Sequence, residues 1–143
     1  MWFGDIKLSH PTKKIKDLLD DLPPNLILPG YVSGDIIKGA YGRCNIFFFP
    51  SREETEGIVV LEALASKCNI LLRDIPVFSS WLKDKENCYM GKNTNDFVSI
   101  IKKMISGEYP SLINNGYEVA KKKELSIIGK ELCDVYNQVL NSN

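Results

Sequence analysis

Two glutamates with seven residues between them, Glu54 and Glu62, stand on either side of the start of an apolar helix. The predicted helix near 57–67 is apolar nearly all round and carries one carboxylate, Glu62. Burial of a carboxylate without partners is costly, so Glu62 either points to solvent or accepts hydrogen bonds from donors such as hydroxyls. The second arrangement is typical of a ligand site.

The turn before this helix favours a ligand that carries both an anion and hydroxyls. A strand that ends at Phe49 leads through the acidic turn 50–57 to Gly57, which allows close backbone approach where the helix begins. The free amides of a first helical turn can hold an anion. Since a helix rises about 1.5 Å per residue, Glu62 lies about 7 Å along the axis from those amides. A carboxylate beside a phosphate site is the arrangement that a nucleotide requires.

The segment 48–65, FFPSREETEGIVVLEALA, resembles the Glu-x7-Glu motif of family 4 retaining glycosyltransferases, which have the GT-B fold. The motif is specific, and the similarity covers most of the chain. Four further segments most resemble the bacterial branch that glucosylates diacylglycerol lipids, namely 2–5, 29–32, 34–41 and 72–78. The resemblance implies that residues 1–143 form one nucleotide-sugar-binding domain, the C-terminal domain of such an enzyme.

The resemblance assigns different roles to the two glutamates. It implies that Glu62 accepts hydrogen bonds from both ribose hydroxyls of the nucleotide. Glu54 is the catalytic candidate, because the matching residue holds the hydroxyls of the donor sugar and helps to organise charge at the reacting carbon. A plainer interpretation makes Glu62 a solvent-facing residue, and makes Glu53, Glu54 and Glu56 N-terminal charges that the helix dipole favours. Only Glu54 has the motif's separation from Glu62.

The remaining candidate residues bind the donor through the main chain or by apolar contact. The resemblance places the sugar and the diphosphate against Thr55, Glu56, Gly57, Ile58 and Val59. It places the base against Tyr31 and Val32, for which an ordinary turn with one core aromatic is the alternative. Thr55 and Glu56 depart from the commoner Glu-Gly-Phe-Gly pattern, and this departure resembles the glycolipid-synthase branch.

Composition excludes several classes of function. Lys plus Arg and Asp plus Glu both total 18, so the overall charge does not favour nucleic acid. The four cysteines form no Cys-x-x-Cys pair and His10 is the single histidine, so we expect no metal site. Neither a membrane span nor a signal peptide is apparent. We expect a cytoplasmic protein that at most touches the inner face of the cell membrane, where the lysines around 121–123 offer a basic tract.

Short apolar runs alternate with helical patterns, which predicts a Rossmann-like α/β fold with a parallel sheet and flanking helices. We expect strands near 1–4, 26–29, 45–49, 69–73 and 87–90. We expect helices near 11–22, 34–42, 57–67, 76–84, 94–107, 110–122 and 125–141. Ligands of such sheets bind beyond the carboxyl ends of the strands, where the loops that carry the candidate residues converge.

The last predicted helix has an apolar stripe at Leu125, Ile128, Leu132, Val135 and Val139. Spacings of three and four residues place these side chains on one helix face. The stripe is expected to pack on its own domain. In GT-B enzymes the terminal helix crosses to the other domain, which is the alternative.

Positive charge for a diphosphate is scarce in this chain. Its three arginines are Arg43, Arg52 and Arg73, and no suitable loop carries a basic pair. In the family, the Arg and Lys that hold the diphosphate follow the first strand of this domain. The chain is therefore expected to begin one βα unit late and to lack the N-terminal domain that receives the acceptor. Catalysis needs both walls of the cleft, so the isolated chain is expected to be inactive.

The function expected from sequence is that of the donor-binding domain of a retaining hexosyltransferase. The expected donor is UDP-glucose and the expected acceptor is a lipid of the diacylglycerol type, with no metal or other cofactor. Two alternatives remain open: a glycosyltransferase for capsule, wall polymer or protein, and a non-catalytic scaffold with the same fold.

Overall fold

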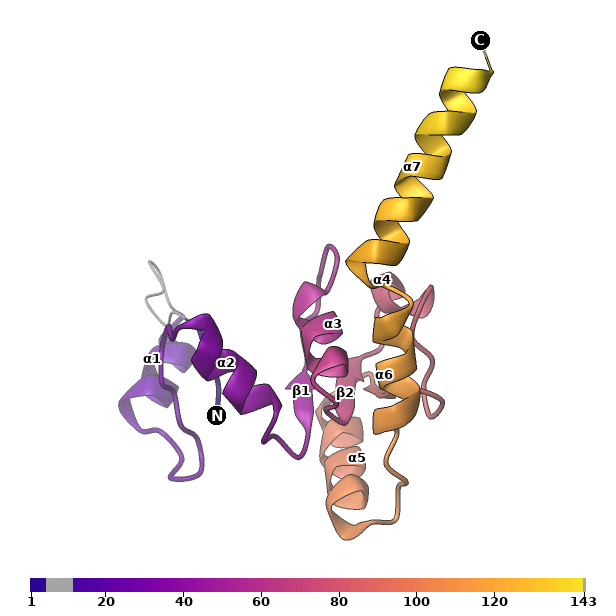
Figure 1. Cartoon of the computed structure of the whole chain (residues 1–143). Helices are drawn as coiled ribbons and strands as arrows, with labels where there is room; N and C mark the ends of the chain where they lie inside the picture. The colour runs from indigo at the N-terminus through magenta and orange to yellow at the C-terminus, as the bar shows by residue number, and fades with distance from the viewer. Residues whose placement is uncertain (5–11, 143) are drawn as a thin grey trace. The chain divides into compact units, whose positions relative to one another are not determined.

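The computed structural model describes residues 1–4 and 12–142 and divides the chain into two compact units, Met1–Ala40 and Tyr41–Asn143 (Figure 1). We call them the first unit and the second unit. Asp5 and His10, and the start of the helix expected at residue 11, lie outside the described residues.

The first unit holds α1 (Lys13–Asp20) and nearly all of α2 (Gly34–Tyr41). Its two predicted strands are reduced to a parallel bridge between Phe3 and Gly30, with the Gly4 amide donating to the Gly30 carbonyl at 3.0 Å. Pro29 has no N–H to donate, which limits pairing in this segment. Both helices predicted in this part of the chain are present, and α1 ends before Pro23 as expected.

The second unit contains a three-stranded parallel sheet in the order β1 (Phe47–Phe49), β2 (Ile70–Arg73) and β3 (Tyr89–Gly91). Phe47 pairs with Ile70, and Leu71 pairs with Tyr89. Parallel neighbours need crossover connections, which α3 (Ile58–Ala65) supplies between β1 and β2 and α4 (Pro76–Ser79) between β2 and β3. The predicted α/β class is confirmed.

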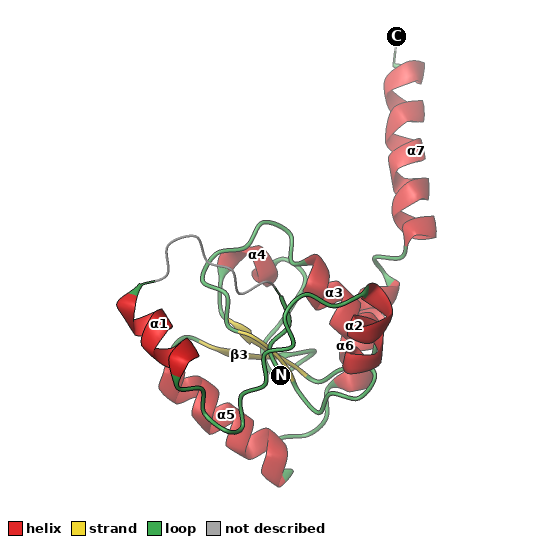
Figure 2. Cartoon of the chain, turned by 90° about the vertical axis from the view of Figure 1, so that its left-hand side faces the viewer, coloured by secondary structure: helices red, strands yellow, loops and turns green. Residues whose placement is uncertain are grey.

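Helices cover both faces of this sheet because β2 alternates its side chains. Ile70 and Leu72 pack in a core cluster with Val60 and Leu64 of α3. The α6 helix (Ile113–Lys121) contacts α3 and adds Val119 and Ala120 to the edge of this cluster. Leu71 points the other way, into a second cluster with residues of α5 (Thr94–Ser106). Figure 2 shows α5 on one side of the strands with α3 and α4 on the other.

Two helices of the second unit are shorter than predicted. The helix expected over 76–84 ends at Ser79, and Asp84 instead accepts a hydrogen bond from the Met90 amide at 2.8 Å. The helix expected from residue 110 begins at Ile113, because the Leu112 amide donates to Asn69 Oδ1 at 3.0 Å. In the first place a side chain of the predicted helix bonds the backbone of another segment, and in the second a side chain from another segment bonds the backbone of the predicted helix. Both contacts compete with the helix.

The α7 helix (Leu125–Asn141) has the predicted bounds but not the predicted packing. None of its residues is buried, and Leu132, Val135 and Val139 are each more than half exposed. The expectation that its apolar stripe packs on its own domain is therefore wrong. The α3 helix already packs against α6 on one face of the sheet, which leaves the stripe without that core as a partner. Within the described ranges, no helix combines the length and the apolar character that crossing a bilayer requires.

The α5 helix is fixed at its start by reciprocal capping. The Asn93 side chain accepts hydrogen bonds from the amides of Asn95 and Asp96, at 2.9 and 3.1 Å. Asp96 in turn accepts from the Asn93 amide at 3.3 Å, which completes a capping box. Such a box satisfies donors that the first helical turn otherwise leaves unpaired.

We predict that Asn93→Ala lowers the free energy of unfolding by about 1 kcal/mol, because it removes both bonds that the side chain accepts. Urea titration followed by circular dichroism measures the change. Asn95→Ala is the matched control, since it removes the same type of side chain from the same turn and leaves both cap bonds intact. Equal stability of the two variants would contradict this role of Asn93.

Candidate functional site

The carboxyl ends of the three strands are tied together by Arg73, the last residue of β2. Its Nε donates to the Pro50 carbonyl at 2.9 Å, and its Nη1 donates to the Lys92 carbonyl at 2.6 Å. Its guanidinium also lies over the Phe97 ring, 5.0 Å from the centroid. The neighbouring Asp74 pairs with Lys92 at 3.5 Å. Arg73 thus holds the carboxyl ends of the three strands together.

Glu54 lies in the turn between β1 and α3, where it is half-buried. Its Oε1 accepts from the Thr55 amide at 2.9 Å and lies 3.5 Å from the Thr55 hydroxyl. In the same turn, the Ser51 hydroxyl donates to the Glu53 carbonyl at 2.7 Å. These local bonds hold the Glu54 carboxylate near its own backbone. Among the described residues, its second oxygen accepts no hydrogen bond.

Gly57 is the N-cap of α3 and has a left-handed backbone, with φ of +75° and ψ of +36°. A Cβ atom at this position would lie 2.6 Å from Cε1 of Phe78, a fully buried ring. The first intrahelical bond runs from the Val60 amide to the Gly57 carbonyl at 2.9 Å. The amides of Ile58 and Val59 precede it and, among the described residues, donate to no acceptor, so they can meet a ligand. Both of these apolar side chains are exposed.

Glu62 lies on the exposed side of α3, four residues after Ile58. Its Oε2 accepts a hydrogen bond from the Tyr41 hydroxyl at 3.2 Å. Burial and, second to it, the negative charge of Glu62 raise the pKa of the Tyr41 phenol. The phenol therefore stays protonated and donates. The carboxylate is both open to solvent and engaged by a hydroxyl, which are the two arrangements expected for it.

The structure brings six consecutive candidates and Glu62 together on one turn and helix. Thr55 and Glu56 have exposed side chains, as the expectation of main-chain binding requires. Tyr31 and Val32 belong to the first unit, directly after the bridge residue Gly30. Tyr31 is 86% exposed, which differs from a core aromatic and leaves its ring free. The assignment of all these residues to a donor site stays a prediction.

Sequence reasoning missed Tyr41 as a member of this site. The residue lies 21 positions before Glu62, and no spacing rule connects the two. The available signal was indirect, because Tyr41 closes the segment 34–41 that resembles the family. A polar aromatic at the end of such a segment is a candidate partner for a motif carboxylate.

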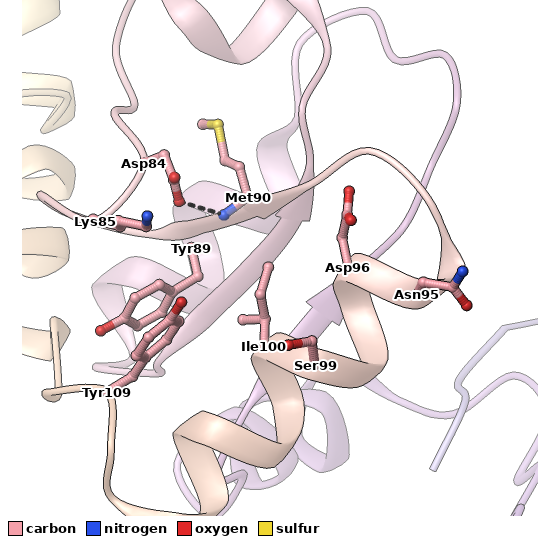
Figure 3. Close-up of a pocket in the computed structure, with 9 residues that line it drawn as sticks. All are labelled: Asp84, Lys85, Tyr89, Met90, Asn95, Asp96, Ser99, Ile100 and Tyr109. Atoms are coloured by element: carbon pink, nitrogen blue, oxygen red, sulfur yellow. Dashed lines mark hydrogen bonds between the residues drawn. The ribbon is translucent and has the colours of Figure 1, made fainter.

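A pocket of about 300 Å³ lies between β3 and α5, away from the turn that carries the candidates (Figure 3). It is lined by Asp84, Lys85, Tyr89, Met90, Asn95, Asp96, Ser99, Ile100 and Tyr109. Its two carboxylates already serve the fold, since Asp84 accepts from the Met90 amide and Asp96 caps α5. None of the candidate residues lines this pocket, and we do not assign the site to it.

Comparison with known proteins decides the family. The family model described as "Glycosyl transferases group 1" matches residues 9–122, which include the whole motif with Glu54, Gly57 and Glu62. The chain belongs to this glycosyltransferase family. The resemblance found in the sequence is therefore confirmed, and with it the assignment to an enzyme class.

Two curated members of the group 1 glycosyltransferases illustrate the relationship. The chain is 42% identical over 140 residues to the processive diacylglycerol alpha-glucosyltransferase of Acholeplasma laidlawii. It is 27% identical over 95 residues to the alpha-galactosylglucosyldiacylglycerol synthase of Streptococcus pneumoniae. These matches cover 98% and 64% of this chain, but 42% and 25% of the relatives. The chain thus spans less than half the length of either relative.

Solved structures show the same fold at low sequence identity. Sucrose-phosphate synthase from Thermosynechococcus elongatus superposes with a TM-score of 0.77 at 18% identity, over 91% of this chain and 34% of that one. Anabaena Alr3699/HepE, solved in complex with UDP-glucose, gives a TM-score of 0.79 at 14% identity, over 95% of this chain and 40% of that one. The agreement confirms the Rossmann-like fold of group 1 glycosyltransferases.

Proposed function

We propose that this chain is the donor-binding part of a retaining hexosyltransferase that transfers glucose from UDP-glucose to a lipid of the diacylglycerol type. The observation that carries the proposal is the 42% identity, over 98% of the chain, to the Acholeplasma laidlawii diacylglycerol glucosyltransferase. Glu54 and Glu62 keep the motif spacing within the matched residues.

The proposed donor site is the turn 50–57 together with the first two turns of α3. Glu62 binds the ribose through its exposed carboxylate, which accepts hydroxyl protons. The amides of Ile58 and Val59 bind the diphosphate, because the first turn of a helix is an anion site. Tyr31 and Val32 bind the base. Glu54, with one carboxylate oxygen unpaired among the described residues, binds the hydroxyls of the hexose.

In the proposed reaction, the bond between the anomeric carbon and the diphosphate oxygen breaks, and a new bond forms from that carbon to an acceptor hydroxyl oxygen on the same face of the sugar. The hydroxyl proton passes to the departing diphosphate. Negative charge builds on the departing UDP, and the amides at the start of α3 stabilise it. Glu54 organises charge at the anomeric carbon. The proposal uses no metal ion. We propose that the cationic clamp and the acceptor domain belong to a part of the protein that corresponds to the larger share of the relative, which this chain does not span.

Two features support a larger protein that works at the inner face of a membrane. The apolar stripe of α7 is exposed, and we propose that it packs against the acceptor domain. Lys122 and Lys123 are exposed at the end of α6, and they offer positive charge to anionic lipid. Contact of this kind needs no membrane-spanning segment.

The proposal is tested by adding UDP-glucose, and separately UDP, to the 143-residue chain and following amide chemical shifts. Saturable shifts at residues 54–62 are expected. Glu62→Ala is expected to raise the Kd for UDP at least tenfold, because a hydrogen bond to a charged group contributes about 1.5–3 kcal/mol. Glu131→Ala, which removes an exposed glutamate from α7, should leave the Kd unchanged.

Two results would contradict the donor-binding function. One is the absence of any shift at millimolar UDP-glucose, which would favour a scaffold that keeps the fold. The other is equal affinity for UDP in Glu62→Ala and the parent chain, which would remove Glu62 from the site.

A further inference from the structure

The hydrogen bond between Tyr41 and Glu62 connects the end of α2 with the middle of α3. It joins two side chains 21 residues apart, at a distance of 3.2 Å between the phenol oxygen and Oε2. Glu62 is exposed, so the bond is not required to satisfy a buried carboxylate. Its effect is therefore on where the carboxylate points.

Tyr41 is itself firmly placed within the second unit. Its ring meets the Phe47 ring of β1 edge-on, with centroids 5.6 Å apart. Its carbonyl oxygen accepts from the thiols of Cys44 and Cys68, at 3.4 and 3.1 Å. Cys68 is fully buried in the core cluster, directly after the end of α3. The ring of Tyr41 is thus packed on the sheet, and its backbone is bonded to the loop that follows α3.

In this hydrogen bond the Tyr41 hydroxyl is the donor. Burial raises the pKa of Tyr41, and the charge of Glu62 raises it further. The hydroxyl therefore keeps its proton and donates to the carboxylate. A donor that neither moves nor ionises can hold an exposed side chain in one rotamer.

A held carboxylate suits the proposed ligand better than a free one. A vicinal diol presents two hydroxyl donors, and an ionised carboxylate offers roughly four lone-pair directions on its two oxygens. One bond from Tyr41 to Oε2 leaves Oε1 and part of Oε2 open. An unrestrained glutamate loses rotamer freedom when it binds, which weakens affinity. Fixing the rotamer beforehand removes part of that loss.

We propose that Tyr41 is a positioning residue of the donor site, whose hydroxyl orients the Glu62 carboxylate toward the ribose diol of the nucleotide. The inference rests on the proposed function of Glu62. It adds a residue from α2 that acts through Glu62 and does not itself contact the ligand.

The direct test is Tyr41→Phe in the 143-residue chain, with UDP as the ligand. Phenylalanine keeps the ring that packs on Phe47 and loses only the hydroxyl. We expect the Kd for UDP to rise about fivefold. The matched control is Tyr89→Phe, which removes a hydroxyl that donates to the Pro110 carbonyl at 2.7 Å. This control should bind UDP as the parent chain does.

A second ligand separates positioning from general damage to the fold. 2′,3′-Dideoxy-UDP lacks both ribose hydroxyls, so it should bind the parent chain and Tyr41→Phe with equal affinity. The Kd for 2′,3′-dideoxy-UDP divided by the Kd for UDP should therefore be about fivefold lower in Tyr41→Phe than in the parent chain. If Tyr41→Phe weakens both ligands equally, its role is structural and the inference fails.

A double-mutant cycle separates the inference from the function on which it rests. In the Glu62→Ala background, Tyr41→Phe should change the Kd for UDP by less than twofold. If Glu62→Ala weakens binding and Tyr41→Phe does not, the inference fails and the proposed function stands. If Glu62→Ala binds UDP like the parent chain, the proposed function fails. Amide spectra of each variant without ligand verify that it is folded.

Discussion

Gly57→Ala is expected to lower the free energy of unfolding of the second unit by about 3 kcal/mol. Two costs combine at this position. A left-handed backbone is unfavourable for alanine, and the new methyl group would lie 2.6 Å from the Phe78 ring. That ring cannot easily move, because Phe49 and Trp81 pack on it edge-on at 6.4 and 5.9 Å. Urea titration monitored by Trp81 fluorescence, with Trp2 replaced by phenylalanine, measures the loss.

Gly107→Ala isolates the conformational part of this cost. Gly107 has a φ of +77°, but a Cβ there would meet nothing within 4 Å. We expect a loss of about 1 kcal/mol from this variant. A similar loss from Gly57→Ala and Gly107→Ala would show that the contact with Phe78 is unimportant.

Relief of the contact provides a second control. Phe78→Leu shortens the side chain that the new methyl group meets. The double variant should therefore lose less free energy of unfolding than the sum of the losses from Gly57→Ala and Phe78→Leu alone. Strict additivity would contradict the steric explanation. UDP binding by Gly57→Ala should also weaken, because a displaced first turn moves the amides of Ile58 and Val59.

Phe78→Ala is expected to lower the free energy of unfolding by about 4 kcal/mol, the largest effect that we predict for this chain. Phe78 is completely buried and packs with Phe49 and Trp81 in the core cluster beneath α3. Truncation leaves a cavity among rings that are held by the sheet and by α4, so collapse around it is limited. Circular dichroism during urea titration measures the loss.

Phe48→Ala is the matched control for this truncation. Phe48 is 41% exposed and meets Phe97 edge-on at 5.0 Å on the opposite face of the sheet. Folding removes less apolar area from water at this position than at Phe78, so we expect Phe48→Ala to lower the free energy of unfolding by about 1–2 kcal/mol. An equal loss from both variants would indicate that burial does not govern the stability of this sheet.

The parts of the fold that sequence predicts well are those with a strong local signal. The run Ile70-Leu71-Leu72 is apolar throughout, as a strand covered on both faces must be, and it forms the central strand. The segment from Glu54 to Glu62 likewise predicts a turn and a helix, because its glycine can adopt the left-handed backbone observed where the helix begins. Here local preference and tertiary structure agree.

The parts that sequence misses depend on distant partners. Whether the 125–141 stripe packs depends on which surface is available to it, and periodicity carries no such information. The helix that begins at Pro76 ends at Ser79, and Asp84, which lies in the predicted helical range, instead bonds Met90, six residues further on. Tyr41 reaches Glu62 because its ring packs on Phe47 of β1. Each of these depends on geometry that only the folded chain defines.

The hydrogen bonds of Arg73 have a thermodynamic consequence for the nucleotide. Because two of its N–H donors are committed to carbonyls of its own chain, this guanidinium is held in place and cannot turn freely toward a bound anion. On the proposed function, the missing positive charge comes from the rest of the protein. Affinity for UDP and association of the two parts are then linked, and each must strengthen the other by the same factor. The sugar donor would in this way strengthen the association of the two parts of the enzyme.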